Sequence, residues 1–175
     1  MTSDISKPLS GVQMDTQSAR FVGLEKLKGA PRISSPRGYA QVAEEFLAAL
    51  ELLPGQPSAA FRPRVYLAAQ ALELILRAYI ARFDKKKLEK LRDYHDIVTL
   101  SKIALEISNT ADRKLSIPTP DLPTWWEELA WLHGSPYLDR YPNEFPFFTF
   151  EAGDPRIADK LRPLLKEVEA ALPDR

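Results

Sequence analysis

Cysteine is absent from this sequence of 175 residues. Its absence excludes disulfide bonds, thiolate zinc sites and cysteine nucleophiles, and it suits a reducing compartment. Net charge is absent as well, because lysine plus arginine and aspartate plus glutamate each number 24. Such a chain has no overall field that attracts nucleic acid or an anionic membrane. The first ten residues, MTSDISKPLS, lack the basic and apolar regions of a secretory signal, so we expect a cytoplasmic protein.

A long uncharged apolar run is also missing. The most apolar stretch, residues 62–83, contains Glu73 and Arg77 near its middle, which argues against a membrane span and predicts no membrane association. Hydrophobic residues make up 45% of the chain and charged residues 27%, the balance of a globular protein with one substantial core. Residues 1–36 are rich in Ser, Gly, Pro and charge. We therefore expect a flexible N-terminal arm followed by a single helical domain over residues 37–175.

Hydrophobic periodicity predicts helices along the rest of the chain. Apolar residues recur at spacings of three and four over 38–53, 62–83, 94–107, 124–134 and from Asp154 almost to the C-terminus. The charged link 84–93 has space for one more helical turn, and its Asp93 is the expected N-cap of the helix that follows. Pro163 is expected to kink or break the last helix. The sequence thus predicts an all-α, up-and-down bundle of about five helices, with a Pro- and aromatic-rich loop at 136–153 before the last helix.

The segment 62–83 is predicted to be the central helix, because apolar residues surround it except along one polar stripe. Gln70, Glu73 and Arg77 lie on that stripe at i, i+3 and i+7. Polar side chains on a buried helix need partners. The candidate partners are His95 and Asp96 at the start of the next helix, and Arg140 and Tyr141 in the Pro-rich loop.

The members of this candidate polar cluster have both a structural and a functional interpretation. Glu73 and Arg77 form either a buried structural ion pair or a ligand-facing one. His95 either locks two helices together or serves as a base or ligand, and Arg140 with Tyr141 either pins the loop or binds an anionic group. A metal-dependent phosphohydrolase site of the His-Asp type is excluded, since no histidine precedes His95. We therefore predict no catalytic residue, no metal ion and no cofactor.

Three short motifs stand out by their order and spacing: AAQALELILRAYI at 68–80, YHDIVTLSKIA at 94–104 and RYP at 140–142. Together they resemble the HEPN-type domains, a family of helical bundles that is widespread in prokaryotes. The first motif is similar to the family's long helix, in which a basic residue follows an acidic one four positions later. The second resembles the His-Asp-aliphatic start of the next helix, and the third recurs after the following helix in such proteins. The resemblance covers roughly residues 38–172.

HEPN-type proteins include ribonucleases, toxins of toxin–antitoxin pairs and partners of small nucleotidyltransferases. The nuclease members share a motif of Arg, four to six residues, and His. Here the only histidines are His95 and His133, and no arginine lies five to seven positions before either. The resemblance therefore implies a non-catalytic protein that acts by association, as a homodimer or with a partner such as a toxin–antitoxin or nucleotidyltransferase component. The alternative is a ligand-binding or RNA-processing domain of this type, with a polar cleft around Glu73, His95 and Arg140.

The weak candidate for nucleic-acid contact is one basic run, formed by Lys85, Lys86, Lys87, Lys90 and Arg92. A charge run of this kind is typical of a solvated surface, and RNA binding is the alternative. Trp125, Trp126 and Trp131 have no basic residues interleaved with them. We therefore expect these tryptophans in the core or in a dimer interface rather than in a base-stacking platform.

Overall fold

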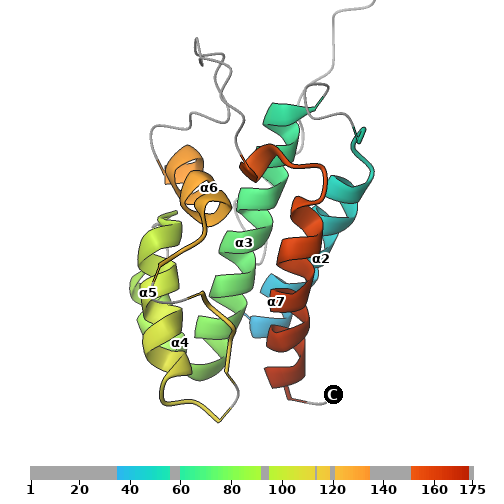
Figure 1. The fold of residues 1–175 in the computed structure, drawn as a ribbon. Helices are drawn as coiled ribbons and strands as arrows, with labels where there is room; N and C mark the ends of the chain where they lie inside the picture. Colours follow the sequence, from blue (N-terminus) through green and yellow to red (C-terminus); the bar gives the residue numbers. More distant parts are fainter. Residues whose placement is uncertain are drawn as a thin grey trace, which may run out of the picture. The chain divides into compact units, whose positions relative to one another are not determined.

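The described part of the chain is a bundle of helices. The computed structural model describes residues 35–55, 60–91, 95–112, 114–118, 121–134 and 151–173. Within these ranges it contains six α-helices and one short 3-10 helix, and no strand (Figure 1). The predicted all-α helical bundle is therefore confirmed. None of the helices in these ranges is long and apolar enough to cross a lipid bilayer.

Parts of two predicted segments lie outside the described residues. The predicted N-terminal arm is described only from Ser35 onward, and the predicted Pro-rich loop only from Glu151. The described end of that loop is the 3-10 helix η1, Glu151–Gly153. All the described helices belong to one compact unit, Ile33–Arg175.

The central helix is α3, Phe61–Phe83, which begins one residue before the predicted range and ends at the predicted residue. Pro63 lies in its first turn, where the missing N–H has no intrahelical acceptor to bond. α3 contacts every other described helix as well as η1. Its Leu72 and Leu76 are fully buried, and Glu73 and Arg77 on the polar stripe are buried beside them. Glu73 and Arg77 therefore lie inside the bundle, whereas Gln70 on the same stripe is half-buried.

α2, Pro36–Glu51, runs antiparallel to α3 (Figure 1). It begins and ends two residues earlier than the predicted range 38–53. The hydroxyl of Ser35 sets this start, because it accepts a hydrogen bond from the backbone N–H of Gly38 at 2.9 Å. Ala43 and Leu47 on the buried face of α2 are fully inaccessible to solvent.

α7, Ile157–Ala171, packs against both α2 and α3. Arg162 fastens α7 to α2 through ion pairs with Glu44 and Glu51, the latter with Nε 2.8 Å from Oε1. The hydrogen bond and the charge of Arg162 lower the pKa of Glu51, although partial desolvation opposes them. This pairing joins α7 to α2 at the edge of the buried contact between the two helices.

The last helix starts later than predicted, and of the kink or break predicted at Pro163 the break does not occur. α7 starts at Ile157 because Asp154 forms a preceding turn, with its carboxylate accepting the N–H of Arg156 at 2.8 Å. The helix also continues through Pro163 and is not broken there. Pro163 and Asp159 are both exposed, so water can bond the Asp159 carbonyl that lacks an N–H partner. Buried leucines on both sides of the proline, Leu161 and Leu164, hold the two halves on the core.

α4, Lys85–Lys90, is the short helical turn expected in the charged link. α5, Ile97–Ser108, begins three residues later than predicted, and its N-cap is Asp96. The Asp96 carboxylate accepts hydrogen bonds from the Val98 N–H at 2.9 Å and the Thr99 hydroxyl at 2.6 Å. The predicted cap, Asp93, lies outside the described residues. Asp96 is the N-cap of α5 because its carboxylate accepts a backbone N–H group of the first turn, which has no partner within the helix.

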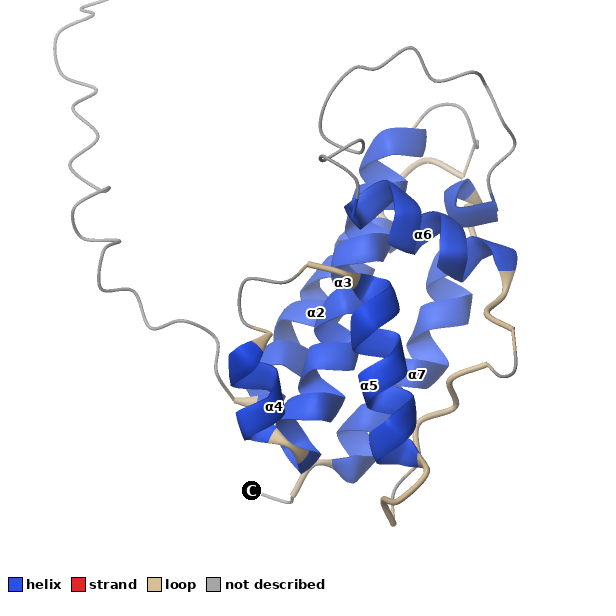
Figure 2. Cartoon of the chain, turned by 90° about the vertical axis from the view of Figure 1, so that its left-hand side faces the viewer, coloured by secondary structure: helices blue, strands red, loops and turns tan. Residues whose placement is uncertain are grey.

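α6, Thr124–Gly134, packs on α3 and α5 (Figure 2). Trp126 is fully buried, and its indole N–H donates to the hydroxyl of Ser101 on α5 at 3.0 Å. Trp125 is also buried, whereas Trp131 is 52% exposed. Trp125 and Trp126 therefore lie in the core, which is one of the two positions predicted for the tryptophans.

Gly153 offers a test of the packing between η1 and α3. A Cβ at Gly153 would overlap the ring of Phe61, whereas a Cβ at Gly134 would meet nothing within 4 Å. Arg64 donates to the Gly153 carbonyl at 3.3 Å, which hinders η1 from moving away. We expect Gly153→Ala to lower the free energy of unfolding by about 1–3 kcal/mol in urea denaturation. The control, Gly134→Ala, should leave it unchanged or slightly higher, and equal effects of the two variants would contradict this packing.

Candidate functional site

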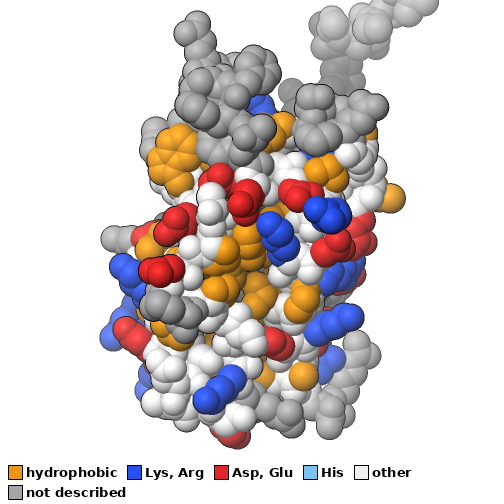
Figure 3. Space-filling model, in the orientation of Figure 1, with side chains coloured by type: hydrophobic (Ala, Val, Ile, Leu, Met, Phe, Trp, Pro, Cys, Tyr) orange, Lys and Arg blue, Asp and Glu red, His pale blue; other side chains and the backbone are white. Residues whose placement is uncertain are grey.

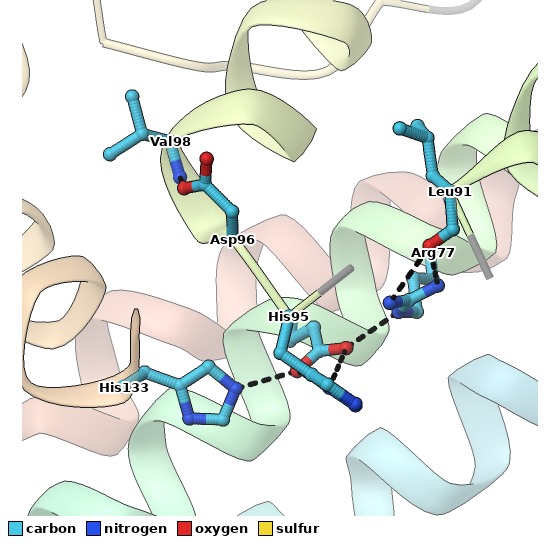
Figure 4. Close-up of polar contacts among 7 residues, drawn as sticks. Arg77, Leu91, His95, Asp96, Val98 and His133 are labelled. Atoms are coloured by element: carbon cyan, nitrogen blue, oxygen red, sulfur yellow. Dashed lines mark hydrogen bonds and ion pairs between the residues drawn. The ribbon is translucent and has the colours of Figure 1, made fainter. Parts of the chain in front are cut away.

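Glu73 of α3 is the centre of a buried polar cluster (Figure 4). Its Oε1 accepts a hydrogen bond from Arg77 Nε at 2.6 Å, and its Oε2 accepts one from His133 Nε2 at 2.6 Å. His95 Nδ1 lies 3.1 Å from Oε1 and 3.2 Å from Oε2. One carboxylate thus joins α3, α6 and the residues that lead into α5. We call Glu73, Arg77, His95 and His133 the Glu73 cluster.

Arg77 lies one helical turn after Glu73, which brings the two side chains together on one face of α3. Its terminal nitrogens approach the carbonyl of Leu91 at 3.4 and 3.5 Å. Leu91 is the C-cap of α4, so Arg77 also holds the chain as it leaves that helix. Arg77 is only 4% exposed, and it contacts the Glu73 carboxylate and the Leu91 carbonyl. Arg77 therefore acts on the site through Glu73.

His95 is the solvent-facing member of the Glu73 cluster. Its side chain is 56% exposed, compared with 4% for Glu73 and 3% for His133. Sequence analysis placed His95 in the first turn of a helix, which is wrong, because α5 begins only at Ile97. An irregular residue before the N-cap is free to turn back toward α3. In Figure 4 the second ring nitrogen of His95 points away from the carboxylate.

His133 was not included among the candidate site residues, although the sequence carries a signal for it. Trp126, Leu129, Ala130 and His133 are spaced at i, i+3, i+4 and i+7 and form the buried face of α6. A histidine at the last position of an apolar stripe must find a buried partner. That partner is Glu73, 60 residues earlier in the chain. The stripe predicts the burial of His133, but the identity of its partner depends on the tertiary fold.

The partners of Glu73 keep its carboxylate ionised. Desolvation raises the pKa of Glu73, but the hydrogen bond from His133 and the charge and hydrogen bond of Arg77 outweigh it and bring the pKa from 4.5 to about 2. At neutral pH the carboxylate can only accept hydrogen bonds. Each ring nitrogen that faces it must therefore carry a proton. An ionised, fully engaged carboxylate with so low a pKa is a poor general base.

The cluster can hold a charge in place and can offer ligand atoms. Glu73, His95 and His133 contribute one carboxylate and two imidazoles whose ligand atoms all lie within 4.8 Å of one another. The sequence predicts no metal ligand, and this set differs from the predicted polar cluster because it contains His133. Asp96 does not extend the set, because its carboxylate caps α5.

Several predicted site residues lie elsewhere or cannot be placed. Arg140 and Tyr141 are outside the described residues, as is Arg92. In the basic run, Lys85, Lys86, Lys87 and Lys90 lie on α4, and Lys87 pairs with Glu106 of α5 at 2.7 Å. This exposed ion pair links α4 to α5 at the surface, and RNA contact stays a prediction.

Comparisons with known proteins give no relative. No protein-family model matches the chain, and no curated protein or solved structure is significantly similar to it. The resemblance to HEPN-type domains therefore rests on the three sequence motifs alone.

The low pKa of Glu73 predicts a stability that depends on pH. A group whose pKa falls from 4.5 to about 2 on folding stabilises the protein fully above pH 4.5, and this contribution is lost as pH falls through about 2. A shift of one pKa unit corresponds to about 1.4 kcal/mol, so the fall from 4.5 to about 2 contributes about 3 kcal/mol to the free energy of unfolding. We expect Glu73→Gln to remove this acid-sensitive part in urea denaturation at pH 7 and pH 3 with EDTA present. Glu106→Gln, which removes an exposed carboxylate, should keep the wild-type pH dependence.

Proposed function

We propose that this protein is a HEPN-like helical bundle that acts by self-association and does not cleave RNA by the Arg and His mechanism of the nuclease members. The proposal is supported mainly by the engagement of Glu73. Its carboxylate is ionised, buried and bonded to three side chains from three segments of the chain. A group in this state braces helices well and transfers protons poorly.

Trp131 on α6 supports association as the mode of action. A tryptophan that is 52% exposed presents a large apolar ring to solvent, and aromatic residues are enriched in protein interfaces. Figure 3 shows further hydrophobic side chains on the face that contains α6, between α5 and α7. The chain carries no net charge, so two copies meet no overall electrostatic repulsion. A second copy of the chain is therefore the partner that these features favour.

We expect the untagged protein to be a dimer in size-exclusion chromatography with light scattering. Trp131→Ser should shift the equilibrium toward monomer, because it removes the exposed aromatic ring from the interface. The matched control is Leu52→Ser, which truncates an apolar side chain that is 86% exposed beyond the end of α2. The control should remain dimeric. A wild-type protein that is a monodisperse monomer at high concentration would overturn the association proposal.

The absence of nuclease activity is a separate expectation. A mixed pool of RNA incubated with the purified protein should remain intact, both with and without divalent ions. Cleavage that persists through purification and disappears in Glu73→Gln would show instead that the cluster is catalytic.

A second candidate function is ligand binding at the Glu73 cluster. One observation favours it: His95 exposes 56% of its side chain while it contacts a buried carboxylate. A thermal-shift screen against nucleotides and other small anions should then raise the melting temperature, and His95→Ala should abolish the shift. If every ligand leaves the melting temperature unchanged, anion binding is excluded for this cluster.

A further inference from the structure

We infer that Glu73, His95 and His133 form a binding site for a divalent transition-metal ion such as Zn²⁺. The inference concerns the same cluster as the second candidate function but names a cation in place of an anion as its ligand, and it rests on the cluster acting as a binding site. It is independent of association through Trp131. The three residues belong to α3, to the chain entering α5 and to α6, so the site exists only in the folded bundle.

The distances suit a metal ion after a small movement. His133 Nε2 and Glu73 Oε2 are 2.6 Å apart, and His95 Nδ1 lies 3.1 and 3.2 Å from the two carboxylate oxygens. Ligands about 2 Å from one zinc ion are at most about 4 Å apart, whereas the three ligand atoms span up to 4.8 Å. The exposed His95 ring can rotate toward the ion, and Glu73 Oε2 and His133 Nε2 must separate by about 0.7 Å, because neighbouring ligands of a tetrahedral zinc ion are about 3.3 Å apart.

The chemistry of the ligands selects the class of ion. Two imidazoles with one carboxylate suit zinc, iron(II), cobalt, nickel and copper, whereas magnesium and calcium prefer oxygen ligands. Each imidazole must offer an unprotonated nitrogen to the ion. In each neutral ring the proton moves to the other nitrogen, from His95 Nδ1 to Nε2 and from His133 Nε2 to Nδ1, and the metal takes the two vacated lone pairs. No net proton is released in that exchange.

The surroundings define how an ion would enter and what would hold its ligands. Among the described residues of the cluster, Glu73 and His133 are almost inaccessible and His95 is mostly exposed, so an ion would enter beside His95, where an open coordination position would face solvent. Arg77 Nε bonds Glu73 Oε1 at 2.6 Å and thereby orients Oε2 toward the histidines. The positive charge of Arg77 also opposes a second cation nearby. We therefore expect weaker binding than in a structural zinc site, and a site that exchanges its ion with solution.

The test is a zinc titration of the untagged full chain by isothermal calorimetry, with Mg²⁺ as the comparison ion. We expect one zinc per chain, a rise in melting temperature with zinc and no binding of Mg²⁺. His95→Ala removes a ligand that is mostly exposed, so the fold should persist while zinc affinity falls about tenfold or more. Glu106→Gln, which removes an exposed carboxylate near α4, should bind zinc as the wild type does.

Nuclear magnetic resonance identifies the ligands directly, because the chain contains only two histidines. In the nitrogen spectrum of the imidazole rings, zinc should shift the Nδ1 signal of His95 and the Nε2 signal of His133. No zinc binding, or zinc binding that His95→Ala leaves unchanged, would overturn the inference. Light scattering of the same samples keeps the proposals distinguishable, since a dimer without zinc binding refutes the metal site alone. A rise in melting temperature with nucleotides, without zinc binding, would likewise refute the metal site but not the second candidate function.

Discussion

The burial of one negative charge on the central helix is the constraint on which the rest of this structure depends. An ionised carboxylate inside a helical bundle is costly unless its oxygens are bonded and its charge is compensated. Arg77, one turn along the same helix, supplies the compensating charge. The remaining lone pairs are satisfied by histidines that come from α6 and from the chain before α5. The positions of both segments relative to α3 are therefore coupled to the state of Glu73.

This coupling explains features that look unrelated along the chain. Leu91 is the C-cap of the short helix α4, and its carbonyl accepts a hydrogen bond from Arg77, so the link between α3 and α5 is held where it leaves α4. Asp96 then caps α5 from a position directly after His95. The cap fixes the start of the helix, and the preceding histidine is consequently free to point back to α3. On the other side, the Trp126 bond to Ser101 sets α6 against α5 and so positions His133.

The sequence predicts the bounds of a helix well where the burial of apolar side chains determines them. It predicts the bounds less well where side-chain hydrogen bonds near a helix end determine the first residue. α3 agrees with its prediction to within one residue because a helix that is apolar on most sides leaves few alternatives. The starts of α5 and α7 differ because Asp96 caps α5 in place of the predicted Asp93, and because Asp154 forms a turn that precedes α7. Pro163 did not break α7, since the helix exposes that position to water. His133 was missed for another reason: its partner is 60 residues away, and spacing within one helix does not reveal it.

The contacts of Glu73 differ in how easily they can be replaced. The bonds from Arg77 and His133 are 2.6 Å long and come from side chains that are hardly exposed. The contacts of His95 are longer, at 3.1 and 3.2 Å. Of the three side chains bonded to Glu73, that of His95 is the one that is mostly exposed to solvent. Removing either short bond would leave a buried charge without compensation, which is strongly destabilising. Withdrawing His95 from the carboxylate instead trades one bond for a bond to water. The cluster therefore combines a rigid interior, which holds the bundle together, with one exchangeable position at the surface where binding chemistry can occur.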